Sequence, residues 1–179
     1  TGGITTYSWI NDNTGIGLPD QGTGNITSFI ATNTGTDPIT GTITVTPHFA
    51  NGSVTCDGPS ESFTITVNPS GQVNDPSDQV VCNGSPTTAV SFTTNNGTGL
   101  TTYHWTNNNT GIGLSANGAG DIDPFTATNT GNAPVVATIT VIPRFTYGTI
   151  SCDGPSETFT ITVNPTAQVN DPSDHVVCN

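Results

Sequence analysis

CDGPSESFTITVNPSGQVNDPSDQVVCN, residues 56–83, returns at residues 152–179 as CDGPSETFTITVNPTAQVNDPSDHVVCN, with four substitutions in 28 positions. Each copy holds a cysteine turn, an alternating run FTITVNP, an acidic connector QVNDPSD and a second cysteine run VVCN. This order is typical of a junction, where one module ends and the next begins. The same shift of 96 residues relates 53 identical pairs among 83 overlapping positions, so the chain is a little under two copies of one small domain.

The composition limits the classes of partner. Apolar residues make up 31% of the chain, and one Lys or Arg (Arg144) faces 13 Asp and Glu, for a net charge of −12. Such a surface repels phosphate, so we expect no nucleic acid as partner, and no apolar run is long enough to insert in a membrane. Four cysteines without a CxxC pair favour disulfides in an oxidising compartment. We therefore expect a piece of a longer exported, extracellular protein.

Alternation with a period of two predicts an all-β fold. Tyr7 and Trp9 share one face of TTYSWI, and Phe63, Ile65 and Val67 share one face of SFTITV, with threonines on the opposite face. β-Branched threonine suits the solvated side of a pleated strand. Asn-Gly and Gly-Pro pairs mark turns between these runs.

The repeat divides the chain into an incomplete unit at residues 1–71, a complete unit at 72–167, and the first strand of a following unit at 168–179. The complete unit is expected to have strands at residues 80–82, 89–94, 101–106, 124–128, 135–145 and 157–163, and a loop or a poorly regular edge at 107–121. That many short strands in about 96 residues predicts a two-sheet, immunoglobulin-like β-sandwich with Trp105 between the sheets.

The succession VVCNG, TTYHWTNNNTGIGL, TATNTG, ATITV and FTITVNP resembles the PKD-like, immunoglobulin-like tandem repeats of giant bacterial surface adhesins. In Bacteroidetes-type bacteria such proteins are exported by the type IX route. Tyr103-His104-Trp105 matches the start of the Tyr-x-Trp-Asp-Phe-Gly-Asp signature of PKD domains, whose Gly-Asp end has no counterpart here. The resemblance covers both copies, and it implies a spacer or adhesive repeat on the bacterial cell surface without enzymatic activity.

The cysteines suggest a staple within the complete unit. Cys82 lies on its first expected strand and Cys152 in the turn before its last, which are near one pole in an immunoglobulin-like topology. We predict a Cys82–Cys152 disulfide, stabilising by roughly 4 kcal/mol on the chain-entropy model. Cys56 and Cys178 would then pair outside this chain.

No catalytic constellation is indicated by the sequence. His48, His104 and His175 are replaced by Arg144, Ser8 and Gln79 in the other copy, and no GxSxG, HExxH or phosphate-loop motif occurs. The chain is predicted not to be an enzyme.

Calcium is the one cofactor that the sequence suggests, because the acidic joint repeats its oxygen-bearing side chains. These are Asn74, Asp75, Asp78, Asn170, Asp171 and Asp174. The alternative is a turn in which Asp75-Pro76 ends the strand and Asp78 is solvated.

The predicted function is a structural repeat that extends and stiffens an extracellular surface fibre or adhesin, with a short, ordered joint at residues 72–78. A carbohydrate- or surface-binding module is the alternative, with Tyr147 as its exposed aromatic platform and surface glycans as partners. A third alternative is a filament subunit, because residues 1–71 contain no counterparts of the strands expected at 80–82 and 89–94. Neighbouring repeats, or copies of the chain joined head to tail, would supply them by strand complementation.

Overall fold

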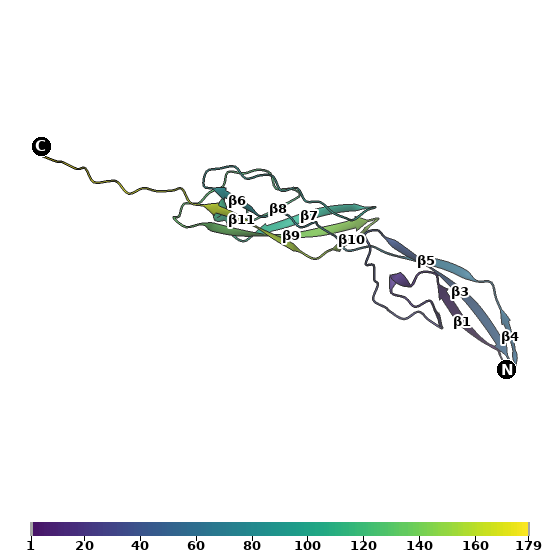
Figure 1. Cartoon of the computed structure of the whole chain (residues 1–179). Helices are drawn as coiled ribbons and strands as arrows, with labels where there is room; N and C mark the ends of the chain where they lie inside the picture. The colour runs from purple at the N-terminus through teal and green to yellow at the C-terminus, as the bar shows by residue number, and fades with distance from the viewer. Residues whose placement is uncertain (1, 179) are drawn as a thin grey trace. The chain divides into compact units, whose positions relative to one another are not determined.

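The computed structural model describes residues 2–178 and forms two β-sheets, with no α-helix among those residues. The strands of the first sheet are β1 (Ile4–Asn11), β2 (Gln21–Thr23), β3 (Ile39–Asn51), β4 (Val54–Asp57) and β5 (Glu61–Val67). Those of the second are β6 (Gln79–Cys82), β7 (Leu100–Asn107), β8 (Asn117–Ala119), β9 (Val135–Tyr147), β10 (Ile150–Asp153) and β11 (Glu157–Asn164) (Figure 1). The all-β prediction is confirmed, and no described helix could cross a membrane.

The first sheet is built around the 13-residue strand β3, which has β1 on one side and β4 and β5 on the other. All its pairings are antiparallel. β5 covers the first half of β3, where Val67 pairs with Ile39, and β4 covers the second half, where Cys56 pairs with Phe49. The only neighbour of β5 in the described sheet is β3, so the other edge of β5 is open.

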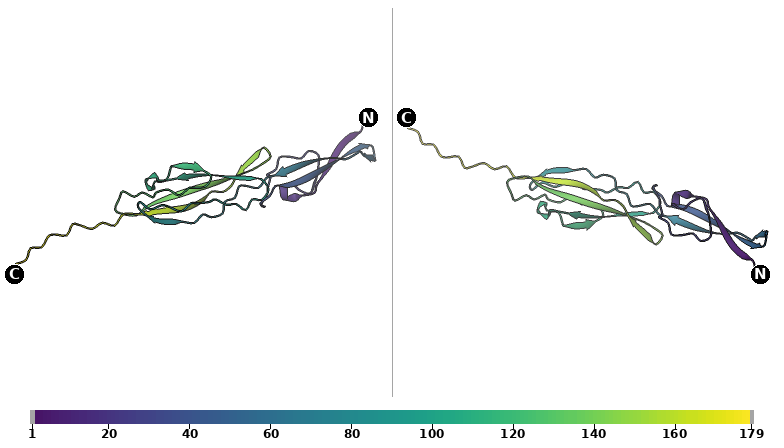
Figure 2. Two further views of the ribbon diagram at one scale, coloured as in Figure 1. Left: turned by 90° about the horizontal axis from the view of Figure 1, so that it is seen from above. Right: turned by 90° about the horizontal axis from the view of Figure 1, so that it is seen from below.

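The second sheet repeats this plan around β9 and adds one strand. Its order is β6-β11-β9-β7-β8, with β10 also beside β9. β6 lies parallel to β11, and Gln79 to Cys82 pair with Ile161 to Asn164. These four residue pairs cover the edge of β11, whereas the equivalent edge of β5 in the first sheet has no such partner among the described residues. Beyond β11 the Asn83 side chain donates to Thr166, and residues 167–178 continue as an extended tail (Figures 1 and 2).

The chain forms two compact units that do not follow the repeat boundaries. Unit 1 contains residues 1–74, 93–102 and 142–155, and unit 2 contains residues 75–92, 103–141 and 156–179.

Each repeat places one isoleucine of its Asn-Thr-Gly-Ile-Gly-Leu segment fully in the core. In the second repeat Asn109 caps the 3₁₀ turn η2 (Thr110–Ile112), and Gly113 ends it in the left-handed region at φ 96°. The first repeat forms the equivalent η1 (Thr14–Ile16) in the same way. Asn107 holds the following loop because its buried side-chain amide donates to the Leu114 carbonyl. The segment at 107–121, predicted to be a loop or a poorly regular edge, contains a buried turn and the short strand β8.

Four of the six predicted strands of the complete unit are confirmed, namely those at 80–82, 101–106, 135–145 and 157–163. The two others, at 89–94 and 124–128, are extended segments without regular ladders. Single bridges join Val90 to Ile122 and Pro86 to Thr126, and the Phe92 N–H donates to the side chain of Asp121. A side chain replaces a backbone partner there, so a continuous strand does not form. The strand β10 was not predicted.

Candidate functional site

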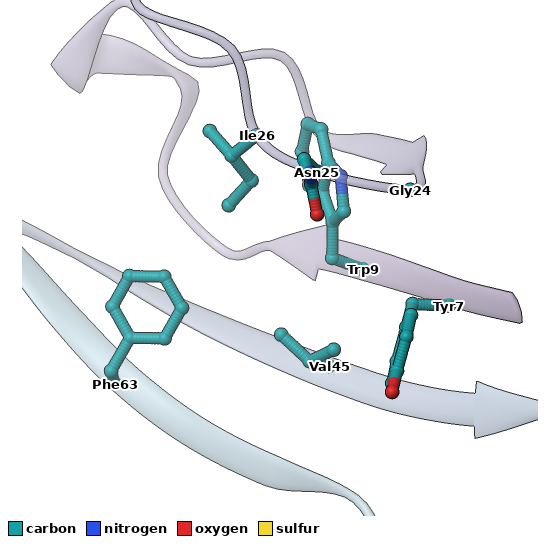
Figure 3. A pocket seen from close by; sticks show the side chains of 7 residues that line it. All are labelled: Tyr7, Trp9, Gly24, Asn25, Ile26, Val45 and Phe63. Carbon is teal, nitrogen blue, oxygen red and sulfur yellow. The ribbon is translucent and has the colours of Figure 1, made fainter.

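The first repeat leaves one apolar face of its sheet uncovered, and this surface is the candidate functional site. Tyr7 and Trp9 come from β1, Val45 from β3, Phe63 from β5, and Ile26 from the segment after β2; we call these five residues the open face. They line a hollow of about 570 Å³ together with Gly24 and Asn25. Figure 3 shows Tyr7 and Phe63 on either side of Val45, with Trp9 and Ile26 opposite.

The second repeat shows how much of this face is normally covered. Tyr7 is 47% exposed, but its counterpart Tyr103 is 9% exposed. Phe63 is also 47% exposed, whereas its counterpart Phe159 is 2% exposed. Because both members of each pair are identical residues on equivalent strands, the difference comes from what packs on them.

The covering group in the second repeat is Phe92. Its ring centroid lies 5.4 Å from that of Tyr103 and 6.4 Å from that of Phe159, the usual range for aromatic pairs. The segment that carries Phe92 is held by backbone hydrogen bonds from 84–90 to 122–127, among them a reciprocal pair between Val90 and Ile122. Residues 1–71 contain no counterpart of this segment, and the open face is uncovered in the described chain.

A polar atom in the open face is also unpaired. The Nε1 of Trp105 donates to the Gly120 carbonyl at 3.2 Å in the second repeat. The equivalent Nε1 of Trp9 is buried and has no hydrogen-bond partner. A buried N–H without an acceptor is unfavourable, although the backbone N–H of Gly24 donates to the Tyr7 carbonyl just as that of Gly120 donates to the Tyr103 carbonyl.

The predicted Cys82–Cys152 disulfide is not formed, and all four thiols are free. Cys152 lies on β10 and pairs with Phe145, while Cys82 pairs with Asn164, one residue beyond the Val163–Val135 pair. Ten residues of β9 separate those two levels, which corresponds to about 33 Å, whereas a disulfide requires Cα atoms within about 7 Å. The prediction was wrong because Cys152 belongs to a long hairpin at the far end of β9, rather than to a turn near β6.

The joint residues are brought together only in part. Asn74 donates from its side chain to Thr93, and the Asp78 carboxylate accepts the Thr160 backbone N–H at 2.6 Å. Asp75 and Asp78 line a hollow of about 320 Å³ beside residues 88–91. Within residues 2–178, no group of three or more His, Cys, Asp or Glu side chains could hold a metal ion.

The second copy of the joint, with Asn170, Asp171 and Asp174, lies in the extended tail. The calcium site therefore stays a prediction. In the structure, the Asp78 carboxylate accepts a backbone N–H at the edge of β11, as a backbone carbonyl of a neighbouring strand would. The sequence did not indicate this role.

A Ser-His-Asp arrangement that the sequence did not indicate lies across β1, β3 and β4. Ser8 Oγ is 2.7 Å from His48 Nε2, and His48 Nδ1 is 2.5 Å from Asp57 Oδ1. The distances match those of a catalytic triad, but Asp57 has 66% of its side chain exposed. The neighbouring residues form the regular β1–β3 and β3–β4 ladders. We interpret the group as a cross-strand polar cluster, and Arg144 with Asp153 forms the equivalent pair in the second repeat at 2.6 and 2.9 Å.

Unit 1 has one further electrostatic contact, between Asp37 and residue 98. The Asp37 carboxylate accepts the Thr98 backbone N–H at 2.6 Å. This hydrogen bond, with one to the Thr98 side chain, lowers the pKa of Asp37 from its ordinary value. The counterpart of Asp37 is Ala133, so comparing the repeats gave no signal for it.

Comparison with known proteins gives little beyond this. No protein-family model matches the chain, and no curated protein matches it. Among solved structures, domains 4 and 5 of the S-layer protein SbsC align over 90% of this chain and 70% of that one, at 18% identity and a TM-score of 0.29.

Proposed function

We propose that this chain is a structural repeat of an extracellular surface fibre or adhesin, in which the segment preceding each sandwich completes its core. The proposal is supported by the different burial of equivalent aromatic side chains in the two repeats. Tyr103 and Phe159 are buried under Phe92, and the identical Tyr7 and Phe63 are half exposed where that segment is missing. The completing segment, residues 79–92, lies between the joint at residues 72–78 and the strands whose core it completes.

The surface chemistry agrees with an extracellular spacer. Hydroxyl pairs line the outer face of the first sheet, with Thr40 near Thr66, Thr44 near Ser62 and Thr46 near Ser60 at 2.8–2.9 Å. In each pair, the two hydroxyl groups hydrogen-bond to each other across neighbouring strands. Together with the net charge of −12, this polar surface keeps the sheet soluble. A bacterial cell-surface location follows from this proposal, and an antibody against the chain should stain intact cells.

The core-completion proposal is tested with a peptide. A synthetic peptide with the sequence of residues 72–97, carrying Cys82→Ser, is titrated into the full chain and followed by NMR. We expect the Trp9 indole signal to move as its Nε1 gains an acceptor, while the Trp105 signal stays in place as an internal control. A peptide that also carries Phe92→Asp should not produce the shift. If neither peptide affects Trp9, the open face is not a site for this segment.

Glycan binding is the second candidate function, and one observation favours it. Tyr147 is 43% exposed at the β9–β10 hairpin and lines a hollow with Ile150 and Ile65. An exposed tyrosine is a platform for a sugar ring. A glycan array tests this reading, and Tyr147→Ala should abolish any binding that occurs there.

A further inference from the structure

The open edge of β5 is the second place where the first repeat lacks a neighbour. In the second sheet, the equivalent edge of β11 carries β6 in parallel register. The residues of β11 that pair with β6 correspond to residues 65–68, which are the last three residues of β5 and the residue after it. An open strand edge is a template for another strand, and the counterpart here shows which strand it is built to take.

The same chain carries a free copy of that strand. Residues 168–178 repeat residues 72–82 with one change, His175 for Gln79. Val176 is 93% exposed and Val177 is 84% exposed in the extended tail (Figure 2). The tail therefore has the sequence of β6 and, within the described chain, no sheet to join.

We propose that residues 175–178 of a second copy add a parallel strand to the open edge of β5, and that Cys178 of that copy then forms a disulfide with Cys152 of the accepting copy. Shifting the β6–β11 register by the repeat length places His175 opposite Ile65 and Cys178 opposite Asn68. The second repeat also shows how the preceding aspartate would be used. Asp78 caps the Thr160 N–H there, so Asp174 would accept the Thr64 N–H.

The position of Cys152 makes it the partner for this thiol. Cys152 lines a hollow of about 590 Å³ together with residues 65–68 of the β5 edge. On the same side, the Asn68 side chain donates to the carbonyls of Tyr147 and Ile150, at 3.3 and 3.4 Å. The β9–β10 hairpin that carries Cys152 is thus directly beside the residue that Cys178 would face.

The pleat of the added strand points the thiol toward this hairpin. Val81 is half buried and Cys82 is exposed in β6, so successive side chains alternate between the core and the outer face. By the same alternation, Val177 would face the core and Cys178 the outer face, where Asn68 meets the hairpin. The distant thiol of Cys56 is excluded, because ten residues of β3 separate the levels of Val67 and Cys56.

The bond forms by thiol–disulfide exchange. One thiolate attacks a small-molecule disulfide, such as oxidised glutathione, and the second thiolate then displaces the bound glutathione. Two thiols of the protein are oxidised to the disulfide, one glutathione disulfide is reduced, and the two protons lost by the protein thiols are taken up by the two glutathione thiols that are released. A four-residue edge strand binds weakly by itself, so the covalent bond is what would hold two copies together.

This inference rests on the proposed function, since it names the partner for one part of the incomplete repeat. The tail supplies the counterpart of β6 and not that of Phe92, so it would cover the β5 edge and leave the open face uncovered. The two proposals can therefore fail separately. If the peptide of residues 72–97 shifts Trp9 but the tail does not crosslink to Cys152, only the present inference is wrong.

The test uses the full chain carrying Cys56→Ser and Cys82→Ser, which leaves Cys152 and Cys178. The concentrated protein is incubated with reduced and oxidised glutathione and run on non-reducing gels. We expect a ladder that extends beyond dimers and collapses on reduction, with the Cys178–Cys152 peptide pair as the main crosslink in mass spectrometry. Cys178–Cys178 or Cys152–Cys152 as the main pair would overturn the proposal.

A matched pair of tail variants separates strand docking from random collision of exposed thiols. Val177→Asp places a charge where the docked strand faces the core, while Val169→Asp makes the same change outside the four paired positions. We expect Val177→Asp to slow crosslinking by roughly tenfold or more and Val169→Asp to leave the rate unchanged. Equal rates for the two variants would show that no strand is docked, and would also overturn the proposal.

Discussion

Single side chains explain why two repeats with nearly the same sequence differ in state. Tyr7 and Tyr103 occupy the same place in the same kind of strand, and so do Phe63 and Phe159. Their exposure differs because one aromatic ring, Phe92, is present over one pair and absent over the other. Burial here is decided by a residue distant in sequence rather than by the strand itself.

Asp37 gives a prediction of pH dependence. The Thr98 backbone N–H lowers the pKa of this carboxylate, so its contribution to stability is present above the unfolded-state pKa and is lost as the pH falls through the folded one. We expect the Thr98 amide signal to titrate with a midpoint below 3.8, the ordinary value for the carboxylate. Asp37→Asn should remove this titration, and Asp123→Asn, at an exposed position, should leave it unchanged. A midpoint above the ordinary value would contradict the assignment.

Gly154 gives a second prediction at this scale, based on a close backbone approach in unit 1. A Cβ built at Gly154 would overlap the Gly71 carbonyl oxygen, whereas the nearest atom to one built at Gly58, its counterpart, would be a side-chain carbon of Pro47 at 2.9 Å. We expect Gly154→Ala to force apart the chains around residues 71 and 154, and Gly58→Ala to be better tolerated. Hydrogen exchange of the residue 70–72 amides measures the difference, and equal effects of the two changes would contradict the expectation.

Ser8 provides a test of the polar cluster. If Ser8, His48 and Asp57 only link strands, a fluorophosphonate probe should not label Ser8, and Ser8→Ala should not change the rate of nitrophenyl acetate hydrolysis. Asp57→Asn should cost no more than about 1 kcal/mol of unfolding free energy, as is usual for an exposed pair. Covalent labelling of Ser8 would require a different interpretation of the cluster.

At the scale of elements, the segment 84–92 is the one that closes a sandwich, and Phe92 is its anchor. Phe92 is 7% exposed and packs on two aromatic rings, so Phe92→Ala should cost about 3–5 kcal/mol. Phe63→Ala, in the open repeat, should cost only about 1 kcal/mol because half of that side chain is already in water. Urea unfolding of the two variants measures both values. A Phe63→Ala cost as large as that of Phe92→Ala would show that the open face is covered in solution.

The strands that were predicted correctly are those with strong alternation, such as FTITV and ATITV, where one face is fully buried. The closing segment at 89–94 also alternates, but its backbone finds a single bridge at Val90 and a side-chain acceptor at Asp121. Sequence periodicity cannot reveal that a side-chain acceptor replaces a backbone acceptor at this position. The buried 3₁₀ turn at Ile112 was missed because its period is three rather than two.

The candidate site could be anticipated only in outline. The count of missing strands predicted that the first repeat lacks part of its core; Tyr7 and Phe63 are half exposed in the described chain, and the division into units stays a prediction. The cysteine pairing failed, because it assumed that Cys82 and Cys152 share a pole. The lengths of β9 and of its hairpin with β10 decide that point, and the repeat pattern does not encode strand order. The Ser8–His48–Asp57 cluster differs between the repeats, so comparing them pointed away from it.

For the molecule as a whole, the strands of the second sheet all lie within the complete unit at residues 72–167. This unit begins with the joint at residues 72–78, and β6 and Phe92, which complete its core, directly follow that joint. In an array, each core would be completed by the residues that follow its own joint, and a disulfide of the Cys178–Cys152 kind would cross the joint to the next unit. The proposed fibre is therefore a chain of interdependent units.

The parallel pairing of β6 with β11 also determines how a pulled chain would yield. The chain enters the pair beside Ile161, at Gln79, and leaves it beside Cys82, at Asn164, so tension acts on opposite ends of two parallel strands. All the hydrogen bonds of the pair are then loaded together in shear, whereas the β3–β4 hairpin would unzip one bond at a time. Force spectroscopy on tandem copies should give a higher rupture force than for the variant Val81→Pro, which removes a donor from the sheared pair. A module of this kind resists stretching through the geometry of four residue pairs, without needing a large core.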